Sequence, residues 1–237
     1  MKLIRPSIII TDIIEPTEII RKLELAARTC YQSTDNKKET NPEKFLRAII
    51  KHGHESVLEH VNISFRVITD RGVSMEWIRH RIGCSYSQES TRYCKYSDDK
   101  DMMFIDHYGI DEGGDVKDLI HRGYKVYEMK YNILIDSGAP PQIARQILPN
   151  GLKTEFYCTM NIRALRHFFK LRCAKPAHPF MKEIAIPFLL ELQSELPCLF
   201  DDIEYDYEFS DKYLQDAIKH VVSYDAEYIY HACGSNE

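Results

Sequence analysis

The stretch WIRHRIGCSYSQESTRYCKYS, residues 77–97, places Arg79, His80 and Arg81 side by side, next to the chain's one tryptophan. The apolar pattern of residues 73–82 predicts a helix, in which successive side chains step by about 100° around the axis. The three adjacent side chains therefore cannot all face solvent, and at least one points toward the interior or an interface. A buried charge without a partner costs several kcal/mol, so this segment needs an anion nearby.

The charge of the chain is unevenly distributed. Its 237 residues include 31 Lys and Arg against 36 Asp and Glu, a net charge of −5, which makes the whole protein a poor binder of polyanions. Residues 71–96 nevertheless carry five Lys or Arg against two Glu, whereas residues 201–237 carry ten acids against two lysines. Any anion site is therefore local and lies in the basic middle of the chain.

Two explanations of the RHR group stay open from the residues alone. The nearby carboxylates are those of Glu76 and Glu89, which leaves room for the phosphate of a ligand. A solvated basic helix end is the simpler alternative, because cations are favourable at the negative end of the helix dipole.

A second arginine raises the same question in NIRALRHFFKLR, residues 161–172. Arg172 falls seven positions after Leu165 and continues the apolar stripe of this predicted helix, where a cation is out of place. A structural ion pair explains Arg172, and so does snorkelling from the helix end. A ligand site is the third alternative.

Other residues of the same kinds lie close to these segments. Asn161 is placed to cap the predicted helix, and Arg163 and His167 are i, i+4 neighbours on an adjoining face. Arg145, in IARQILP, lies on a short predicted helix between apolar residues. Several arginines converging on one pocket suit phosphates and planar imides, because the guanidinium group is bidentate and stays charged.

The periodicities predict one α+β domain, long enough to bury a substantial core. Apolar alternation and short apolar runs predict strands at 3–10, 61–67, 102–105 and 152–160. Helical spacing with start and stop signals, such as Asn41 as a cap, predicts helices at 15–31, 42–52, 73–82, 115–137, 161–173, 179–196 and 210–222, and a short one after Pro140. Residues 83–100 have little apolar periodicity and are predicted to form a long functional loop.

Several other classes of protein are disfavoured. The seven cysteines are odd in number and show no CxxC spacing, which favours a reduced cytoplasmic protein without structural zinc. Cys30 and Cys94 lack the local basic partner of a reactive thiol, and we interpret them as inert. The N-terminal apolar run is short and predicts a strand rather than a signal peptide. No window approaches the roughly 18 apolar residues of a membrane span.

Histidines and glutamates gather in HGHESVLEH, residues 52–60. The spacing is not HExxH, and Gly53 interrupts the helix that would present the ligands. We therefore predict no metal site, and polar or cofactor contacts for His52, His54 and His60.

RHR and a following SxR form a specific pair of motifs, here Arg79-His80-Arg81 and Ser90-Thr91-Arg92. The pair resembles the signature of the flavin-dependent thymidylate synthases. The segments AARTCY (26–31), KHGHES (51–56), DRGVSMEW (70–77), SQESTRYCKYS (87–97), ARQILP (144–149) and NIRALRHFFKLR (161–172) resemble the family's other blocks in order. The resemblance covers residues 1–200. The spacer 82–89 is one residue longer than is usual in the family, and residues 201–237 form an acidic C-terminal extension of unknown role.

The resemblance implies a single domain with a central, mostly antiparallel sheet flanked by helices, assembling as a homotetramer. It implies a cytoplasmic enzyme that makes dTMP from dUMP, with 5,10-methylenetetrahydrofolate as carbon donor and NADPH as reductant. FAD would bind where subunits meet, and hydride would pass from reduced FAD to the uracil ring. No metal, nucleic acid or membrane is implied as a partner.

The resemblance also implies roles for individual residues. The dUMP site would comprise Glu76, Arg79, Gln88, Glu89, Ser90, Thr91, Arg92, Arg145 and Arg172. The FAD site would comprise His54, Ser56, Arg79, His80, Arg81, Gln88, Asn161, Ile162, Arg163 and His167. Ser90 and Arg172 would be catalytic, and the fixed positive charge of Arg172 would favour ionisation of the uracil at N3.

The alternative function is a non-enzymatic RNA-binding module. Bases would stack on Trp77, Tyr86, Tyr93 and Tyr96 beside the same cations. This alternative gives no task to Arg145 or Arg172, and the acidic C-terminal residues argue against it.

Overall fold

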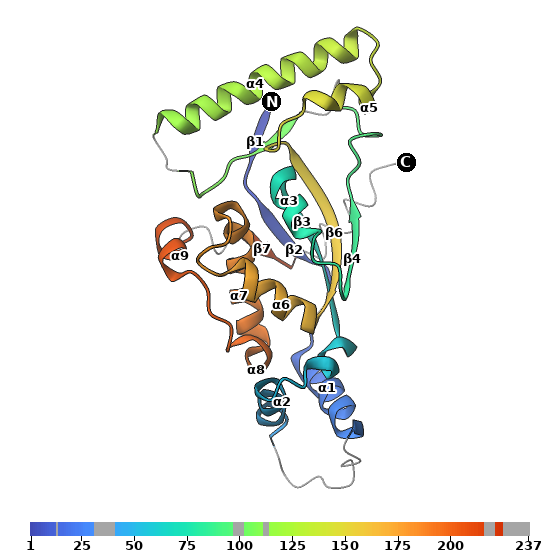
Figure 1. The fold of residues 1–237 in the computed structure, drawn as a ribbon, viewed down its shortest axis with the longest axis vertical. Coiled ribbons are helices and arrows are strands. Elements are labelled where there is room, and N and C mark those ends of the chain that lie inside the picture. The colour runs from blue at the N-terminus through green and yellow to red at the C-terminus, as the bar shows by residue number, and fades with distance from the viewer. Residues whose placement is uncertain (13, 31–40, 97–101, 111–113, 216–220, 225–237) are drawn as a thin grey trace.

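A five-stranded sheet forms the centre of the computed structural model, which describes residues 1–12, 14–30, 41–96, 102–110, 114–215 and 221–224 (Figure 1). Its strands run in the order β4 (Cys84–Gln88), β6 (Lys153–Asn161), β3 (Asn62–Asp70), β2 (Ser7–Ile10) and β7 (Val222–Ser223). The first three pairings are antiparallel, and β2 pairs with β7 in parallel. A separate parallel pair joins β1 (Lys2–Ile4) to β5 (Met103–Ile105). The predicted α+β class with a mostly antiparallel central sheet is confirmed.

The antiparallel pairing of β3 with β6 organises this sheet. The register places Phe65 opposite Cys158 and Val67 opposite Phe156, and each of these side chains is at most 1% exposed. The alternate residues face the other way, as at Tyr157, whose side chain is 43% exposed. Apolar burial of this kind contributes about 25 cal/mol per Å², so a one-residue slip that exposed this row would be costly.

Helices lie beside the sheet and extend the molecule at both ends (Figure 1). Beside the sheet lie α3 (Arg71–Trp77), α6 (Ile162–Arg172), α7 (Pro179–Glu195) and α9 (Tyr207–Tyr213). At one end lie α1 (Pro16–Cys30), α2 (Pro42–Lys51), the 3-10 helix η1 (Glu55–His60) and α8 (Pro197–Phe200), and at the other α4 (Asp115–Asp136), α5 (Pro141–Ala144) and the 3-10 helix η2 (Arg145–Ile147). The predicted caps are confirmed: Asn41 accepts from Glu43 N at 2.9 Å, and Asn161 accepts from Ala164 N at 2.8 Å.

Aromatic side chains join α3 and α6 to the sheet. The ring centroid of Trp77 lies 4.3 Å from that of Phe168 on α6 and 5.5 Å from that of Phe156 on β6. Trp77 and Phe168 are both 0% exposed. The C-terminal end of α3, where the RHR group begins, is therefore fixed between the sheet and α6.

The predicted strand 3–10 is wrong as one continuous element. Pro6 has no N–H to give to a ladder, and the chain changes sheets there. The carbonyl of Ile4 accepts from Asp106 N at 2.9 Å beside β5, whereas Ser7 pairs with Ile68 of β3.

The predicted helix 210–222 is also wrong in extent. Helix α9 begins earlier, at Tyr207, and ends at Tyr213, and Val222 lies in a strand beside Ile8. The remainder of the prediction between these elements, residues 216–220, lies outside the described residues. Phe209, Leu214 and Val221 are at most 7% exposed and belong to the main core. The described part of the acidic C-terminal extension thus packs on the domain.

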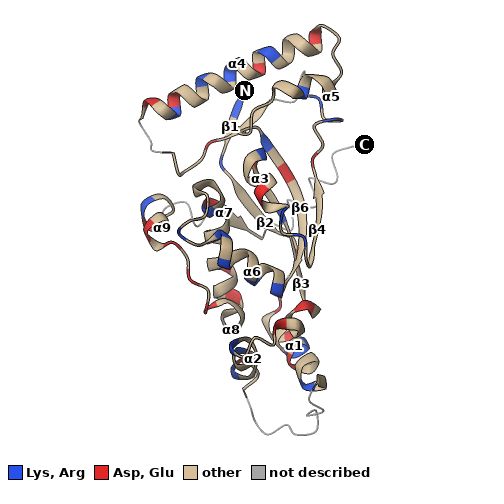
Figure 2. Ribbon diagram, in the orientation of Figure 1, with Lys and Arg blue, Asp and Glu red and all other residues tan. Residues whose placement is uncertain are grey.

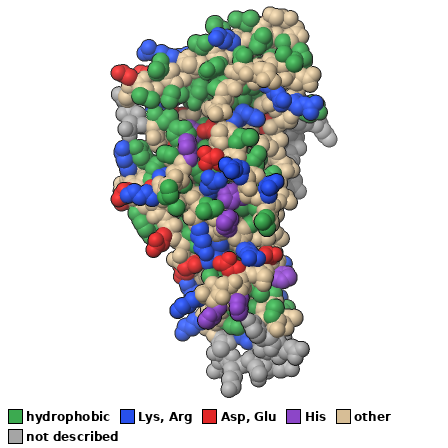
Figure 3. Space-filling view, in the orientation of Figure 1, with side chains coloured by type: hydrophobic (Ala, Val, Ile, Leu, Met, Phe, Trp, Pro, Cys, Tyr) green, Lys and Arg blue, Asp and Glu red, His purple; other side chains and the backbone are tan. Residues whose placement is uncertain are grey.

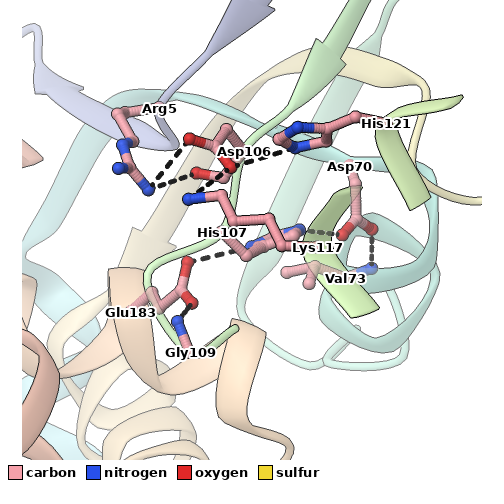
Figure 4. A network of polar contacts seen from close by, with 9 residues as sticks. All are labelled: Arg5, Asp70, Val73, Asp106, His107, Gly109, Lys117, His121 and Glu183. Atoms are coloured by element: carbon pink, nitrogen blue, oxygen red, sulfur yellow. Dashed lines mark hydrogen bonds and ion pairs between the residues drawn. The ribbon is translucent and has the colours of Figure 1, made fainter. Parts of the chain in front are cut away.

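A buried polar network joins the end of β3 to α7 (Figure 4). His107, which is 1% exposed, contacts Asp70 Oδ2 through Nε2 at 2.5 Å and Glu183 Oε2 through Nδ1 at 2.9 Å. Its ring stacks on Phe180, with centroids 3.7 Å apart. Burial alone lowers the pKa of His107, but the hydrogen bonds to the two carboxylates outweigh it and raise this pKa to about 9. The imidazolium therefore compensates two buried carboxylates.

Candidate active site

The RHR group lies on a turn between α3 and β4, which corrects the predicted helix 73–82. Helix α3 ends at Trp77, and the hydroxyl of Tyr86 donates to the carbonyls of Trp77 at 3.4 Å and of His80 at 2.5 Å. A side chain from the next strand thus satisfies carbonyls that a longer helix would have used itself. Figure 2 shows the basic positions on this turn.

The predicted loop 83–100 begins with a strand, which is a second correction. Cys84, Tyr86 and Gln88 are half-buried, and the serines between them are exposed. The inward and outward residues of this strand differ little in hydrophobicity, so the sequence pattern does not predict the strand. Residues 97–100 of the predicted loop lie outside the described residues.

A cleft of about 740 Å³ brings together most of the residues predicted to hold FAD. Its lining includes Arg79, His80, Arg81, Asn161, Arg163 and His167. Glycine at position 83, with φ of +70°, permits this arrangement, because a Cβ there would lie 2.3 Å from Asn161 Nδ2. Figure 3 shows Lys, Arg and His side chains gathered across the middle of this face.

The charges in this cleft are unequal. Among the described residues, Arg79 and Arg81 are exposed and make no hydrogen bond or ion pair, whereas Arg163 Nη1 lies 2.6 Å from Glu59 Oε1. Burial, reinforced by the charge of Arg172, lowers the pKa of His80 to about 4. His80 is therefore neutral at pH 7, and the RHR group presents two positive charges rather than three.

Arg172 lies behind His80, where groups from the α3 segment hold its guanidinium. Its Nε donates to His80 Nε2 at 2.9 Å, Nη1 to Glu76 Oε2 at 3.2 Å and Nη2 to the Glu76 carbonyl at 3.1 Å. The structural ion pair proposed as one explanation is confirmed. An arginine has five N–H donors, so two remain without a partner among the described residues, on a side chain that is 20% exposed.

A second, smaller cleft of about 290 Å³ holds part of the predicted dUMP site. Arg145 Nη1 donates to Thr91 Oγ1 at 3.4 Å there. Arg71 lines the same cleft, a residue that the sequence reasoning missed; its place at the start of α3, beside an N-terminal helix dipole, was the available signal. Arg79 lines the larger cleft, so the described chain divides the predicted dUMP residues between two clefts.

Residues 88–92 are held by hydrogen bonds within the chain. Gln88 Nε2 donates to Ser74 Oγ and to Thr154 Oγ1, each at 3.1 Å, and so points into the protein. Ser90 Oγ accepts from Arg92 N at 3.3 Å.

Glu89 is likewise engaged within the chain. It accepts from Lys153 Nζ and from the hydroxyl of Tyr96, each at 2.9 Å. Burial and Glu89 raise the pKa of Tyr96. The predicted nucleotide contacts of Gln88 and Glu89 stay predictions.

Four of the predicted FAD residues lie outside the lining of the larger cleft: Gln88, described above, and His54, Ser56 and Ile162. His54 and Ser56 are exposed at the start of η1, whose Glu55 and Glu59 do line it. Ile162 is 0% exposed, and its N–H donates to the Val61 carbonyl at 3.0 Å. Their flavin contacts remain predictions.

The stacking surface of the RNA-binding alternative is not formed by the described aromatic residues. Trp77 is 0% exposed, and Tyr86 and Tyr96 are half-buried with their hydroxyls bonded inside the protein. Tyr93 is exposed, at 78%. In the described part of the chain, no group of three or more His, Cys, Asp and Glu side chains is arranged to hold a metal ion.

The fold and the site define an α+β protein with two clefts lined by arginines, and solved structures share this fold. A UMP/dUMP methylase from Streptomyces cacaoi, solved with bound 5-Br dUMP, superimposes with a TM-score of 0.72 at 23% identity, over 85% of this chain and 96% of that chain. A likeness at this identity concerns the fold. No helix within the described residues has the length and apolarity needed to cross a membrane.

Sequence comparison identifies the family. The model of the family described as "Thymidylate synthase complementing protein" matches residues 12–198. A flavin-dependent thymidylate synthase from Geobacter sulfurreducens is 34% identical over 185 residues, covering 75% of this chain and 79% of the relative. One from Mycobacterium tuberculosis is 32% identical over 200 residues, covering 77% and 78%. The chain belongs to the flavin-dependent thymidylate synthase family.

Proposed function

We propose that this protein is a flavin-dependent thymidylate synthase that makes dTMP from dUMP, with 5,10-methylenetetrahydrofolate as carbon donor and NADPH as reductant. The observation that carries the proposal is that arginines line two clefts within the part of the chain that matches the family. Arg79, Arg81 and Arg163 line one cleft, and Arg145 lines the other. Such a set suits a dinucleotide and a nucleotide monophosphate.

The residues of the larger cleft fit FAD by the chemistry of their donors. FAD carries a diphosphate, and Arg79 and Arg81 are exposed cations without a carboxylate partner among the described residues. His167 adds a further polar ring, 5.9 Å in centroid distance from His80. When bound, the flavin supplies the hydride for the reaction. The protein's part is to bind, to orient and to polarise.

Arg172 is the residue that we propose to polarise the uracil. Its contacts with Glu76 and His80 fix the plane of the guanidinium in advance, so that little reorganisation accompanies the reaction. The two remaining N–H donors suit the planar edge of an imide. The positive charge of Arg172 would stabilise the anion formed by ionisation at N3. Ser90 would help to position the same substrate.

We also propose that the enzyme is a homotetramer with shared sites. In one chain the residues predicted to bind dUMP are divided between two clefts, because Thr91 and Arg145 line one and Arg79 the other. A neighbouring subunit can bring the loop at residues 88–92 against the cleft of another chain. FAD and dUMP would then meet where subunits join.

Substitution of Arg172 tests this function. We expect Arg172→Ala to retain bound flavin and the native mass while turnover falls about 100-fold or more, the usual effect of losing one preorganised electrostatic group. The assay is dTMP formation, with the flavin absorbance spectrum and light scattering on the same samples. Lys170→Ala is the matched control, since Lys170 lies on the same helix with a side chain 48% exposed. Turnover that survives in Arg172→Ala, or an unfolded variant, would return Arg172 to the purely structural interpretation.

A further inference from the structure

The outer side of α4 carries exposed apolar side chains that the proposed chemistry does not use. The inner side packs Tyr124 and Tyr131, 9% and 0% exposed, against the smaller core. On the outer side the side chains of Val116, Leu119, Val126 and Ile133 are 66%, 71%, 44% and 56% exposed. Helix α4 lies across one end of the molecule (Figure 1), where the space-filling view shows hydrophobic side chains at the surface (Figure 3).

These residues belong to one stripe with the spacing of a coiled-coil seam. Its members are Val116, Leu119, Gly123, Val126, Lys130 and Ile133, separated alternately by three and four positions. A sustained alternation of this kind places its members on the side of a helix that packs against another helix. A Cβ built on Gly123 has nothing within 4 Å, so the centre of the stripe is open to the close approach of another helix.

We propose that α4 pairs in antiparallel fashion with α4 of a second copy of this chain. The stripe is self-complementary about a point midway between residues 124 and 125. Antiparallel pairing about that point sets Val116 against Ile133, Leu119 against Lys130 and Gly123 against Val126 of the other copy. A two-fold axis repeats each contact, as in an isologous interface, and the gap at Gly123 receives the side chain of Val126.

The distribution of charge favours the same pairing. The first turn of α4 carries Asp115 and Asp118. Lys130, the charged member of the stripe, would lie alongside that turn in the second copy. A parallel pair would instead place Lys130 against Lys130, two like charges in contact. The proposal of a homotetramer does not specify whether α4 lies at a subunit interface. The proposed α4 contact does not depend on the binding of FAD or dUMP.

Opposite charges at position 119 test both the contact and its register. Leu119→Glu and Leu119→Lys remove the same apolar side chain, but glutamate would face Lys130 of the second copy with opposite charge and lysine with like charge. We expect the mass in solution, measured by light scattering, to halve for Leu119→Lys and to stay at the wild-type value for Leu119→Glu. We expect Val126→Asp to halve it as well. Lys125→Asp, the same new charge on the neighbouring residue away from the stripe, should leave it unchanged.

The mass in solution tests the α4 contact independently of folding and of the proposed function. Circular dichroism on each variant establishes that the chain is folded, and the mass alone decides the proposal, whatever the dTMP assay gives. A monomeric wild-type protein would overturn it. So would an unchanged mass in Leu119→Lys and Val126→Asp, or an equal fall in mass for the glutamate and lysine variants at position 119.

Discussion

His107 is the clearest case of a single residue joining distant parts of the chain. Its partners Asp70 and Glu183 are 37 and 76 positions away in sequence, and Gly109 N also donates to Glu183 (Figure 4). The pKa of His107, raised to about 9 by the two carboxylates against the effect of burial, makes the folded protein bind a proton that the unfolded chain releases above pH 6.5. The stability from this group is therefore complete below pH 6.5 and is lost as the pH rises through 9.

We predict that the free energy of unfolding falls by about 3 kcal/mol between pH 6.5 and pH 9.5, from a shift of about 2.5 units at about 1.4 kcal/mol each. Urea unfolding followed by circular dichroism at several pH values measures it. His121→Gln is the control, because His121 lies in the same region but contacts the more accessible Asp106 at 3.3 Å. That variant should keep the full slope. A wild-type stability that is flat from pH 6.5 to 9.5 would contradict the charged state assigned to His107.

Among the elements, α6 is tied to the C-terminal segment by a buried arginine that the sequence reasoning did not single out. Arg166 is 1% exposed, and its two Nη atoms each lie 2.7 Å from an oxygen of Asp202. Arg166 also donates to the Leu199 carbonyl. The hydrogen bond from Arg166 lowers the pKa of Asp202. Residues 199–202 thereby hold the start of the acidic extension against α6.

Asp202→Asn tests this connection. The substitution leaves a buried guanidinium with poorer compensation, and we expect a loss of about 1–3 kcal/mol in the free energy of unfolding. Asp201→Asn is the matched control, since Asp201 pairs with the exposed Arg47, and exposed pairs contribute about 0–1 kcal/mol. Chemical unfolding of both variants at pH 7 makes the comparison. Equal stability of the two variants would show that the Arg166 contact does not anchor the segment.

Elements with strong local signals could be predicted from the sequence. The alternation at Ile63, Phe65 and Val67 matches the buried face of β3, and the caps at Asn41 and Asn161 lie where their side chains predict. Strand β4 could not be predicted, because its inward residues are no more apolar than a loop's. The end of α3 depends on the hydroxyl of Tyr86, nine positions later, and a contact across a turn leaves no periodic trace.

The candidate site was predictable only in part, because sequence motifs reveal residue types but not contacts between distant segments. Motifs indicated the arginines, and the structure places Arg79, Arg81 and Arg163 in one cleft. Local pattern could not reveal that His80 is neutral, because the low pKa comes from burial and from Arg172, 92 positions away. The place of Arg71 at the start of α3 was a local signal, but no pattern in the sequence indicated that Arg71 lies beside Arg145.

Over the whole molecule, the basic residues in the middle of the chain and the acidic residues of the C-terminal extension make different contacts. The arginines of the two clefts lie on segments around the central sheet (Figure 2). Because these positive charges are concentrated locally, anion sites there are compatible with the net charge of −5 of the whole chain. The described acidic residues after position 200 include partners of cations on the domain, such as Asp202 with Arg166 and Asp206 with Lys182 at 2.8 Å.

Flavin-dependent methylation of dUMP by the purified protein can be followed in a single absorbance experiment. We expect a flavin spectrum that NADPH bleaches in the absence of oxygen. Addition of dUMP together with 5,10-methylenetetrahydrofolate should restore it, with one dTMP formed for each flavin reoxidised. Omission of dUMP should leave the flavin reduced. A protein that binds no FAD, or whose reduced flavin stays bleached with both substrates present and yields no dTMP, would not be a flavin-dependent thymidylate synthase.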